Sequence, residues 1–171
     1  ALQRVMSVRR FGDMMRRLDE GKLPAITEEN VMGFARAQLA QARDMLQEAV
    51  LEVFEWLRPR GWTGAGKLKT NGGGEVGQKA ILPSVVSIDW GRWRVSYHYR
   101  QHLIALENVF NGLAGNGEIC KANQSLLHTA IEASTTGEGE TDLFAFRACR
   151  NGNLHLTFRR PDLLERFNAI A

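Results

Sequence analysis

The chain has 171 residues, a mass of 19.2 kDa and a formal net charge of +3, values typical of one ordinary domain. Apolar residues make up 44% of the chain and charged residues 24%, which excludes a wholly disordered chain, a fibre and a disulfide scaffold. No apolar run is long enough to span a bilayer, and Arg9, Arg10 and Asp13 interrupt the apolar core that a signal peptide needs. Cys120 and Cys149 have no CxxC spacing and are interpreted as reduced thiols, so we expect a cytoplasmic domain without membrane contact.

The N-terminal part of the sequence predicts helices. Residues 4–20 place apolar side chains broadly on one side of a helix, and because this pattern begins abruptly we expect residues before Ala1 to be missing. Thr27 is a good N-cap for a second helical pattern. The apolar stripe of that pattern covers residues 31–57 and indicates core packing, as one long helix or as two helices with a bend near Gln41.

The rest of the chain predicts loops, strands and shorter helices. The Gly-rich residues 60–78 predict a flexible loop, and residues 79–89 and 93–99 predict strands joined by a turn at 90–92. Helices are predicted over 101–113 and 122–133, followed by a polar loop over 135–140, a strand pair and a helix from Pro161. We therefore predict one α+β domain over residues 1–171. Its mostly antiparallel sheet of about four strands packs on a long N-terminal helix or helix pair, and a C-terminal hairpin and a short helix complete it.

The two C-terminal strands flank an Asn151-Gly152 turn, and the sequence allows two registers for their pairing. A two-residue turn would bury Arg147 and expose two phenylalanines. A three-residue loop, with Gly152 at the left-handed bulge position, instead makes one face wholly apolar. It pairs Phe144, Phe146 and Ala148 with Phe158, Leu156 and Leu154. Because a one-residue slip moves every side chain to the other face, we predict this second register.

In that register the opposite face of the hairpin carries cations and hydrogen-bond donors, and none of its own residues is a carboxylate. Its residues are Arg147, Cys149, Asn153, His155, Thr157 and Arg159. Such a face can hold phosphate or sugar through charge-assisted hydrogen bonds. A neutral His155 can act as a general base, contact a ligand or serve only the structure. A solvated or covered sheet face is the alternative for the whole surface.

Positive charge is concentrated in two segments. Residues 58–79 hold five basic residues and one acidic residue, and residues 147–160 hold four basic residues and no acidic residue. This pattern favours an anionic partner, usually nucleic acid, although the same side chains can also pair with distant carboxylates. The candidate phosphate-binding residues are Arg60, Lys67, Lys69 and Asn71 in the Gly-rich loop, and Arg147, Asn153, Thr157 and Arg159 in the hairpin.

Three further patterns have less specific interpretations. Residues 61–67 fit the phosphate-binding motif GxxxxGK, but Leu68 follows where that motif needs Ser or Thr for magnesium. His98 and His102 have the spacing of a metal pair, but they straddle a predicted strand–helix junction. We therefore predict no metal site and no cofactor.

Aromatic residues interleave with Arg92 and Arg94, a pattern found on surfaces on which the bases of single-stranded nucleic acid stack. A packed hairpin core with a basic tip is the favoured interpretation. These aromatic residues are Trp90, Trp93, Tyr97 and Tyr99.

Several stretches carry a family resemblance. They include residues 23–30 (LPAITEEN), 69–71 (KTN) and, most specifically, 151–168 (NGNLHLTFRRPDLLERFN). From about residue 18 to residue 168 the chain resembles the bacterial "domain of unknown function 4942" family. The resemblance implies an origin in prophages, plasmids or genomic islands, some near toxin–antitoxin genes, and in some members a further methyltransferase domain. The positions that match its motif are Lys69, Thr70, Asn71, Asn151, Gly152, Asn153, His155, Phe158, Arg159 and Asp162.

Three functions follow as hypotheses. The first is a nucleic-acid-binding domain of a mobile-element or phage-defence-related protein that contacts backbone phosphates through the hairpin face and the Gly-rich loop. The second is a toxin-like nuclease with His155 as general base, Arg159 as transition-state clamp and Asn153 as orienting residue. The third is an anti-defence or antitoxin-like inhibitor that binds a protein through the long helix or the Trp90 tip. We predict nucleic acid as the partner and leave a protein partner and the oligomeric state open.

Overall fold

The computed structural model describes residues 12–13, 16–17, 19–21, 27–58, 74–116 and 125–171. The helices among them are α2 (Glu28–Ala40), α3 (Ala42–Leu57), α4 (Arg100–Ala114), α5 (Leu126–Ala133) and α6 (Pro161–Ile170). The strands are β1 (Lys79–Leu82), β2 (Val86–Asp89), β3 (Arg92–Val95), β4 (Glu138–Glu140), β5 (Phe144–Ala148) and β6 (Leu154–Phe158). A 3-10 turn over Tyr97–Tyr99 precedes α4.

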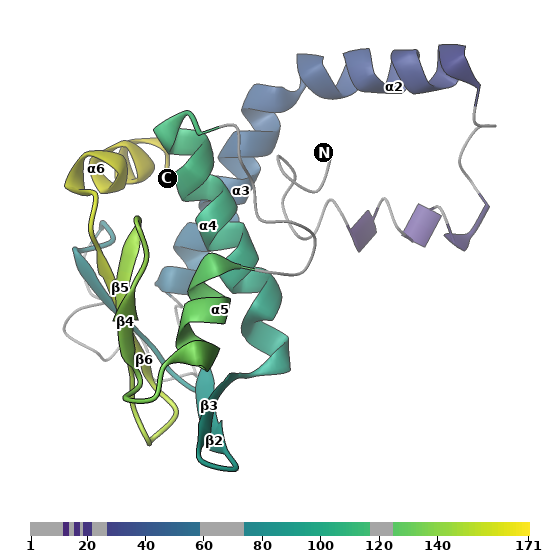
Figure 1. The fold of residues 1–171 in the computed structure, drawn as a ribbon. Helices are drawn as coiled ribbons and strands as arrows, with labels where there is room; N and C mark the ends of the chain where they lie inside the picture. Colours follow the sequence, from purple (N-terminus) through teal and green to yellow (C-terminus); the bar gives the residue numbers. More distant parts are fainter. Residues whose placement is uncertain (1–11, 14–15, 18, 22–26, 59–73, 117–124) are drawn as a thin grey trace.

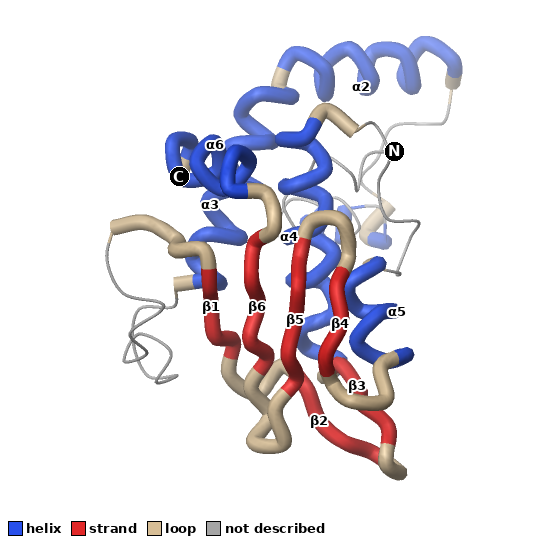
Figure 2. Tube along the Cα trace, turned by 60° about the vertical axis from the view of Figure 1, so that its left-hand side comes forward, coloured by secondary structure: helices blue, strands red, loops and turns tan. Residues whose placement is uncertain are grey.

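The strands form two antiparallel sheets. The larger sheet has four strands in the order β1-β6-β5-β4, and the smaller sheet is the β2–β3 hairpin. Figure 2 shows α3, α4 and α5 on one side of the four-stranded sheet, with α6 near its upper end and the β2–β3 hairpin extending from its lower end. The predicted α+β class, with a mostly antiparallel sheet on a helix pair and a C-terminal hairpin and helix, is confirmed.

The N-terminal helical stripe forms two helices, as the second of the two alternatives predicts. The side-chain oxygen of Thr27 accepts a hydrogen bond from the Asn30 amide at 3.2 Å, which is the predicted N-cap. The helix breaks at Gln41, where α3 begins at a sharp angle to α2 (Figure 1). The described residues within 4–20 include a helical part at 12–13, 16–17 and 19, and the rest of that predicted helix lies outside the described residues.

The core forms where α4, the β5–β6 hairpin and α6 meet. The ring of Phe110 lies 5.4 Å from that of Phe144, 5.1 Å from that of Phe158 and 5.3 Å from that of Phe167, measured between centroids. All four rings are buried, and α3 adds Val53 beside them. Aromatic packing of this kind stabilises beyond area burial alone, so this cluster fixes the side of the sheet that faces the helices.

Three local predictions are wrong in detail. The single strand predicted over residues 79–89 is two strands in different sheets, because Pro83 lacks an amide hydrogen and Ser84 has a left-handed φ of 61°. The polar loop predicted over residues 135–140 contains the edge strand β4, which pairs with β5. The strand predicted over residues 93–99 ends at Val95, where the 3-10 turn follows.

The predicted register of the C-terminal hairpin is confirmed. Phe144 pairs with Phe158, Phe146 with Leu156 and Ala148 with Leu154, and all six side chains are buried. The Cys149 amide donates to the Asn153 carbonyl at 2.8 Å, and Gly152 has a φ of 89° at the left-handed position. A side chain at Gly152 would also lie 3.3 Å from the Val86 carbonyl oxygen, because the turn packs against the start of β2. The polar residues of the hairpin therefore face away from the core.

Candidate nucleic-acid interface

The side of the four-stranded sheet turned away from the helices is named here the outer face. It consists of Lys79 and Ile81 from β1, His155 and Thr157 from β6, Ala145 and Arg147 from β5, and Glu138 and Glu140 from β4. Figure 2 shows this face toward the viewer, with α3, α4 and α5 behind the sheet. None of its side chains is fully buried, because they alternate with the buried positions of β1, β5 and β6, and β4 is exposed throughout. The sheet therefore presents a polar surface.

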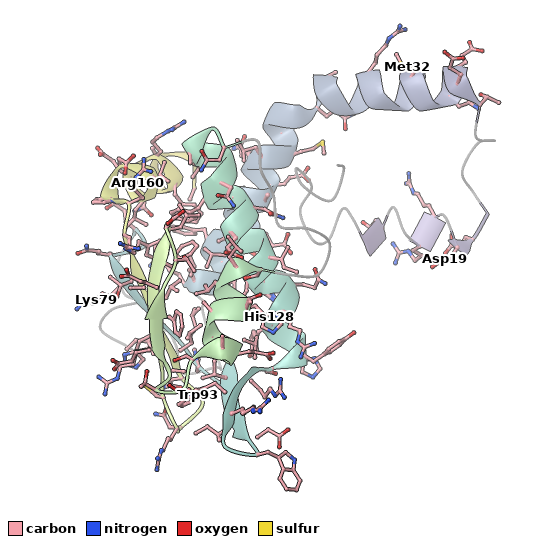
Figure 3. The ribbon with its side chains drawn as sticks, viewed as in Figure 1. Asp19, Met32, Lys79, Trp93, His128 and Arg160 are labelled. Atoms are coloured by element: carbon pink, nitrogen blue, oxygen red, sulfur yellow. The ribbon has the colours of Figure 1, made fainter. Side chains whose placement is uncertain are left out.

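His155 lies on β6, one of the two central strands of the four-stranded sheet. It is directly opposite Arg147 on β5 and Ile81 on β1, and its side chain is half-buried. Thr157, two residues further, pairs with Lys79, whose side chain is exposed and points away from the helices (Figure 3). Lys79 makes no ion pair with any residue that the structure describes. The hairpin pattern alone did not assign this cation to the outer face. Its position in the strand predicted over residues 79–89 is the sequence feature that could have indicated it.

The outer face as a whole is not free of carboxylates, which corrects the expectation drawn from the hairpin alone. The Nε atom of Arg147 lies 3.3 Å from Glu138 Oε1, and Arg159 Nη1 lies 3.6 Å from Glu140 Oε1. The two glutamates come from β4, the edge strand that the sequence pattern presented as a loop. Exposed ion pairs of this kind contribute only about 0–1 kcal/mol, so an anion that reaches the arginines can replace the glutamates.

The remaining predicted site residues have different positions. Arg159 also donates from Nη1 to the Thr141 carbonyl at 2.5 Å, which holds its guanidinium at the edge of the outer face. Asn153 is half-buried in the β5–β6 turn, where its backbone amide donates a hydrogen bond to Asn151 Oδ1 at 3.1 Å. The four candidates of the Gly-rich loop, Arg60, Lys67, Lys69 and Asn71, lie outside the described residues.

Two other positions of the family motif are structural. Phe158 belongs to the core, and Asp162 accepts two hydrogen bonds from Arg160, at 2.9 Å and 2.6 Å. These bonds hold the pKa of the Asp162 carboxyl below its usual value. Asn168, at the end of the same motif, binds both the amide and the carbonyl of Val76 at 2.9 Å. Part of the motif therefore serves the attachment of α6 rather than the outer face.

The β2–β3 hairpin is a second candidate surface. Trp93 is buried and packs on Gly137, as the interpretation of a packed hairpin core requires, whereas Trp90 at the turn is 95% exposed. Tyr97 is also exposed, and the Arg100 guanidinium carbon lies 5.9 Å from the centre of its ring. The aromatic residues of this segment thus divide into core and surface residues.

Glu132 on α5 attaches this hairpin to the body of the protein. Its carboxylate accepts a hydrogen bond from the Val95 amide at 3.2 Å and lies 3.3 Å from Arg94 Nη1 and 3.1 Å from His128 Nε2. Arg100 Nη2 is 4.0 Å away. Partial burial would raise the pKa of Glu132, but its contacts with His128, the Val95 amide and Arg94 outweigh this effect and lower the pKa below 4.5. The folded state therefore favours the ionised carboxylate.

We expect the contribution of Glu132 to stability to disappear in acid. Since its pKa is lower in the folded than in the unfolded chain, the contribution is complete above pH 4.5 and falls as the pH drops through the folded value. Urea denaturation of the wild type and of Glu132→Gln across this range measures the difference between their free energies of unfolding. That difference should shrink below pH 4.5; a difference that stays constant or grows in acid would contradict the assignment.

The histidine pair that resembled a metal motif has other contacts. His102 Nδ1 lies 3.3 Å from the His98 carbonyl oxygen, and the centre of its ring is 5.2 Å from that of Trp56. Across the part of the chain that the structure describes, no three His, Cys, Asp or Glu side chains gather where they could hold a metal ion. In the same part, no helix has the length and apolar character needed to cross a membrane.

Over the residues that the structure describes, the fold is an α+β domain whose four-stranded antiparallel sheet has helices on one side and the outer face on the other. A family model described as "Domain of unknown function (DUF4942)" matches residues 1–171, and the chain belongs to that family. The resemblance inferred from residues 23–30, 69–71 and 151–168 is thereby confirmed, and the match extends over the whole chain. No curated protein and no solved structure matches the chain.

Proposed function

We propose that the chain is a nucleic-acid-binding domain of a mobile-element or phage-defence-related protein, and that its outer face contacts backbone phosphates. The observation that carries the proposal is the hairpin register, which places Arg147, His155 and Thr157 together on the side away from the helices. Lys79 on β1 and Arg159 after β6 extend the same surface. Phosphate contacts of this kind position a strand and supply most of its sequence-independent affinity.

The glutamates of β4 determine how such a surface binds. In the free protein Glu138 and Glu140 occupy the positions beside Arg147 and Arg159 that a phosphate would take. A phosphate oxygen offers the same charge-assisted hydrogen bonds, and its binding releases condensed counterions, which two exposed carboxylates cannot do. When phosphates replace the glutamates, both guanidinium groups are paired with an anion before and after binding. The proposal thus requires that the carboxylates weaken binding.

The double variant Glu138→Gln, Glu140→Gln tests this requirement. It should bind a fluorescently labelled oligonucleotide several-fold more tightly than the wild type at low salt, because two competing negative charges are removed. Fluorescence anisotropy measures the affinity. Asp162→Asn, which removes one carboxylate that lies on α6 and pairs with Arg160, is the control and should change affinity little. No binding by the wild type, or weaker binding by the double variant, would contradict the proposal.

The other two hypotheses stay predictions. A nuclease would use His155 as general base, and the side chain directly opposite it on β5 is the cation Arg147 rather than a carboxylate. Ligand contact by His155 is the role that this arrangement favours. An inhibitor that binds a protein would use exposed apolar side chains, of which Trp90 is the most exposed among the described residues.

A further inference from the structure

Trp90 occupies a two-residue turn that projects from the body of the protein. Asp89 pairs directly with Arg92, which leaves only Trp90 and Gly91 to connect β2 and β3. Both turn residues have left-handed backbone angles, with φ of 49° at Trp90 and 73° at Gly91. Hairpin turns of this type favour Asn or Gly at the first position, and a bulky aromatic residue there is an outlier. Trp90 therefore has an exposed ring and a strained backbone at the same place.

The hairpin that carries Trp90 is held in position at its base. The Trp93 ring packs against Gly137, where an added Cβ would come within 2.7 Å of the ring. The Val95 amide donates to Glu132 at 3.2 Å, and the Ser96 amide donates to the Val85 carbonyl at 2.9 Å. The anchored base holds the backbone of the tip in place, so little backbone freedom is lost when a ligand stacks on the exposed ring.

The same hairpin adjoins the β5–β6 turn at the end of the four-stranded sheet. The Val86 amide, at the start of β2, donates to the Gly152 carbonyl in the β5–β6 turn at 3.1 Å. Arg150 is exposed in that turn, and Arg92 is exposed beside Trp90. Neither arginine forms an ion pair with any described residue. The hairpin extends beyond the end of the four-stranded sheet below α5 (Figure 1), so a strand that leaves the outer face at this end passes the β5–β6 turn before it reaches the indole.

We infer that Trp90 stacks on an unpaired base of the bound nucleic acid, so that the ligand of the outer face is single-stranded or contains an unpaired segment. This inference rests on the proposed function and adds the class of nucleic acid to it. Every base has a π-face, so stacking of this kind tolerates any sequence. A duplex keeps its bases stacked inside the helix and offers only phosphates to the same surface.

The test compares single-stranded and duplex forms of one labelled oligonucleotide by fluorescence anisotropy. Trp90→Ala should lose about tenfold in affinity for the single strand and little for the duplex, whereas Trp90→Phe should keep most of the single-strand affinity. Met32→Ala, which removes another exposed apolar side chain on the distant α2, is the control and should match the wild type (Figure 3). Trp90→Asn should bind the single strand as weakly as Trp90→Ala while raising the thermal midpoint, because asparagine relieves the turn.

The outcomes separate the two proposals. If the wild type binds neither form, the proposed function fails and the inference fails with it. If the wild type binds in a salt-dependent way but Trp90→Ala binds the single strand as well as the wild type does, only the stacking inference is overturned, and a protein partner becomes the better assignment for the tip. An equal loss for single strand and duplex would also overturn stacking.

Discussion

Replacing Gly137 with alanine should lower the free energy of unfolding by about 2 to 4 kcal/mol, because backbone strain and overpacking act together. The added Cβ would lie 2.7 Å from the Cε2 and Cζ2 atoms of Trp93, and the backbone φ of 84° is unfavourable for any L side chain. Trp93 is buried between the hairpin and the β4 segment, so it has little room to move. Urea denaturation followed by circular dichroism gives the change in free energy.

Gly112→Ala is the matched control for this prediction. Gly112 lies in α4, and an added Cβ there would be 3.9 Å from Leu46 Cδ1, an ordinary contact. Alanine in a helix is about 0.5–1 kcal/mol more favourable than glycine, so this variant should be slightly more stable than the wild type. Equal changes in the two variants, or a change of less than about 0.5 kcal/mol in Gly137→Ala, would show that Trp93 is not held as described.

The double variant Arg147→Gln, Arg159→Gln should lose about tenfold in affinity for nucleic acid per arginine, because each guanidinium supplies one charge-assisted contact to phosphate. Both side chains are exposed, so the thermal midpoint should change little. Fluorescence anisotropy at low salt measures the loss, and a denaturation curve verifies the fold.

Arg160→Gln, which removes one positive charge, is the control for the loss per arginine. Arg160 is exposed at the start of α6, and Asp162 binds its guanidinium in a bidentate pair; Figure 3 shows Arg160 beside α6. Substitution at this position should lower affinity much less than substitution at Arg147 or Arg159. If all three arginines contribute equally, affinity depends on net charge alone and not on the outer face.

The C-terminal hairpin was predictable because only one register buries all its apolar residues. Phe144 and Phe158 alternate with polar residues on both strands, and Gly152 provides the left-handed position that this register needs. A period of two residues determines the face of each side chain as soon as the register is known. The polar positions on the outer face follow from the same pattern, which is why Arg147 and His155 could be assigned to one surface.

The contacts that other segments of the chain make with the hairpins were not predictable from the local sequence pattern. β4 has the sequence Glu-Gly-Glu, which has low strand propensity, and it forms a strand only because β5 pairs with it. The contact between Glu132 and Val95 joins residues far apart in the chain, so neither spacing nor periodicity indicates it. The division of Trp90 and Trp93 into exposed and buried residues likewise depends on Gly137, which lies in the turn before β4.

The salt dependence of binding tests the outer face most directly. The affinity of the wild type and of Arg147→Gln, Arg159→Gln is measured between about 50 mM and about 200 mM salt, and the logarithm of the binding constant is plotted against that of the salt concentration. A steep negative slope is expected for the wild type, and the variant's slope should be shallower by roughly 0.7 to 0.9 for each arginine removed. Weak binding that does not change with salt, or equal slopes for both proteins, would contradict phosphate contact through this face.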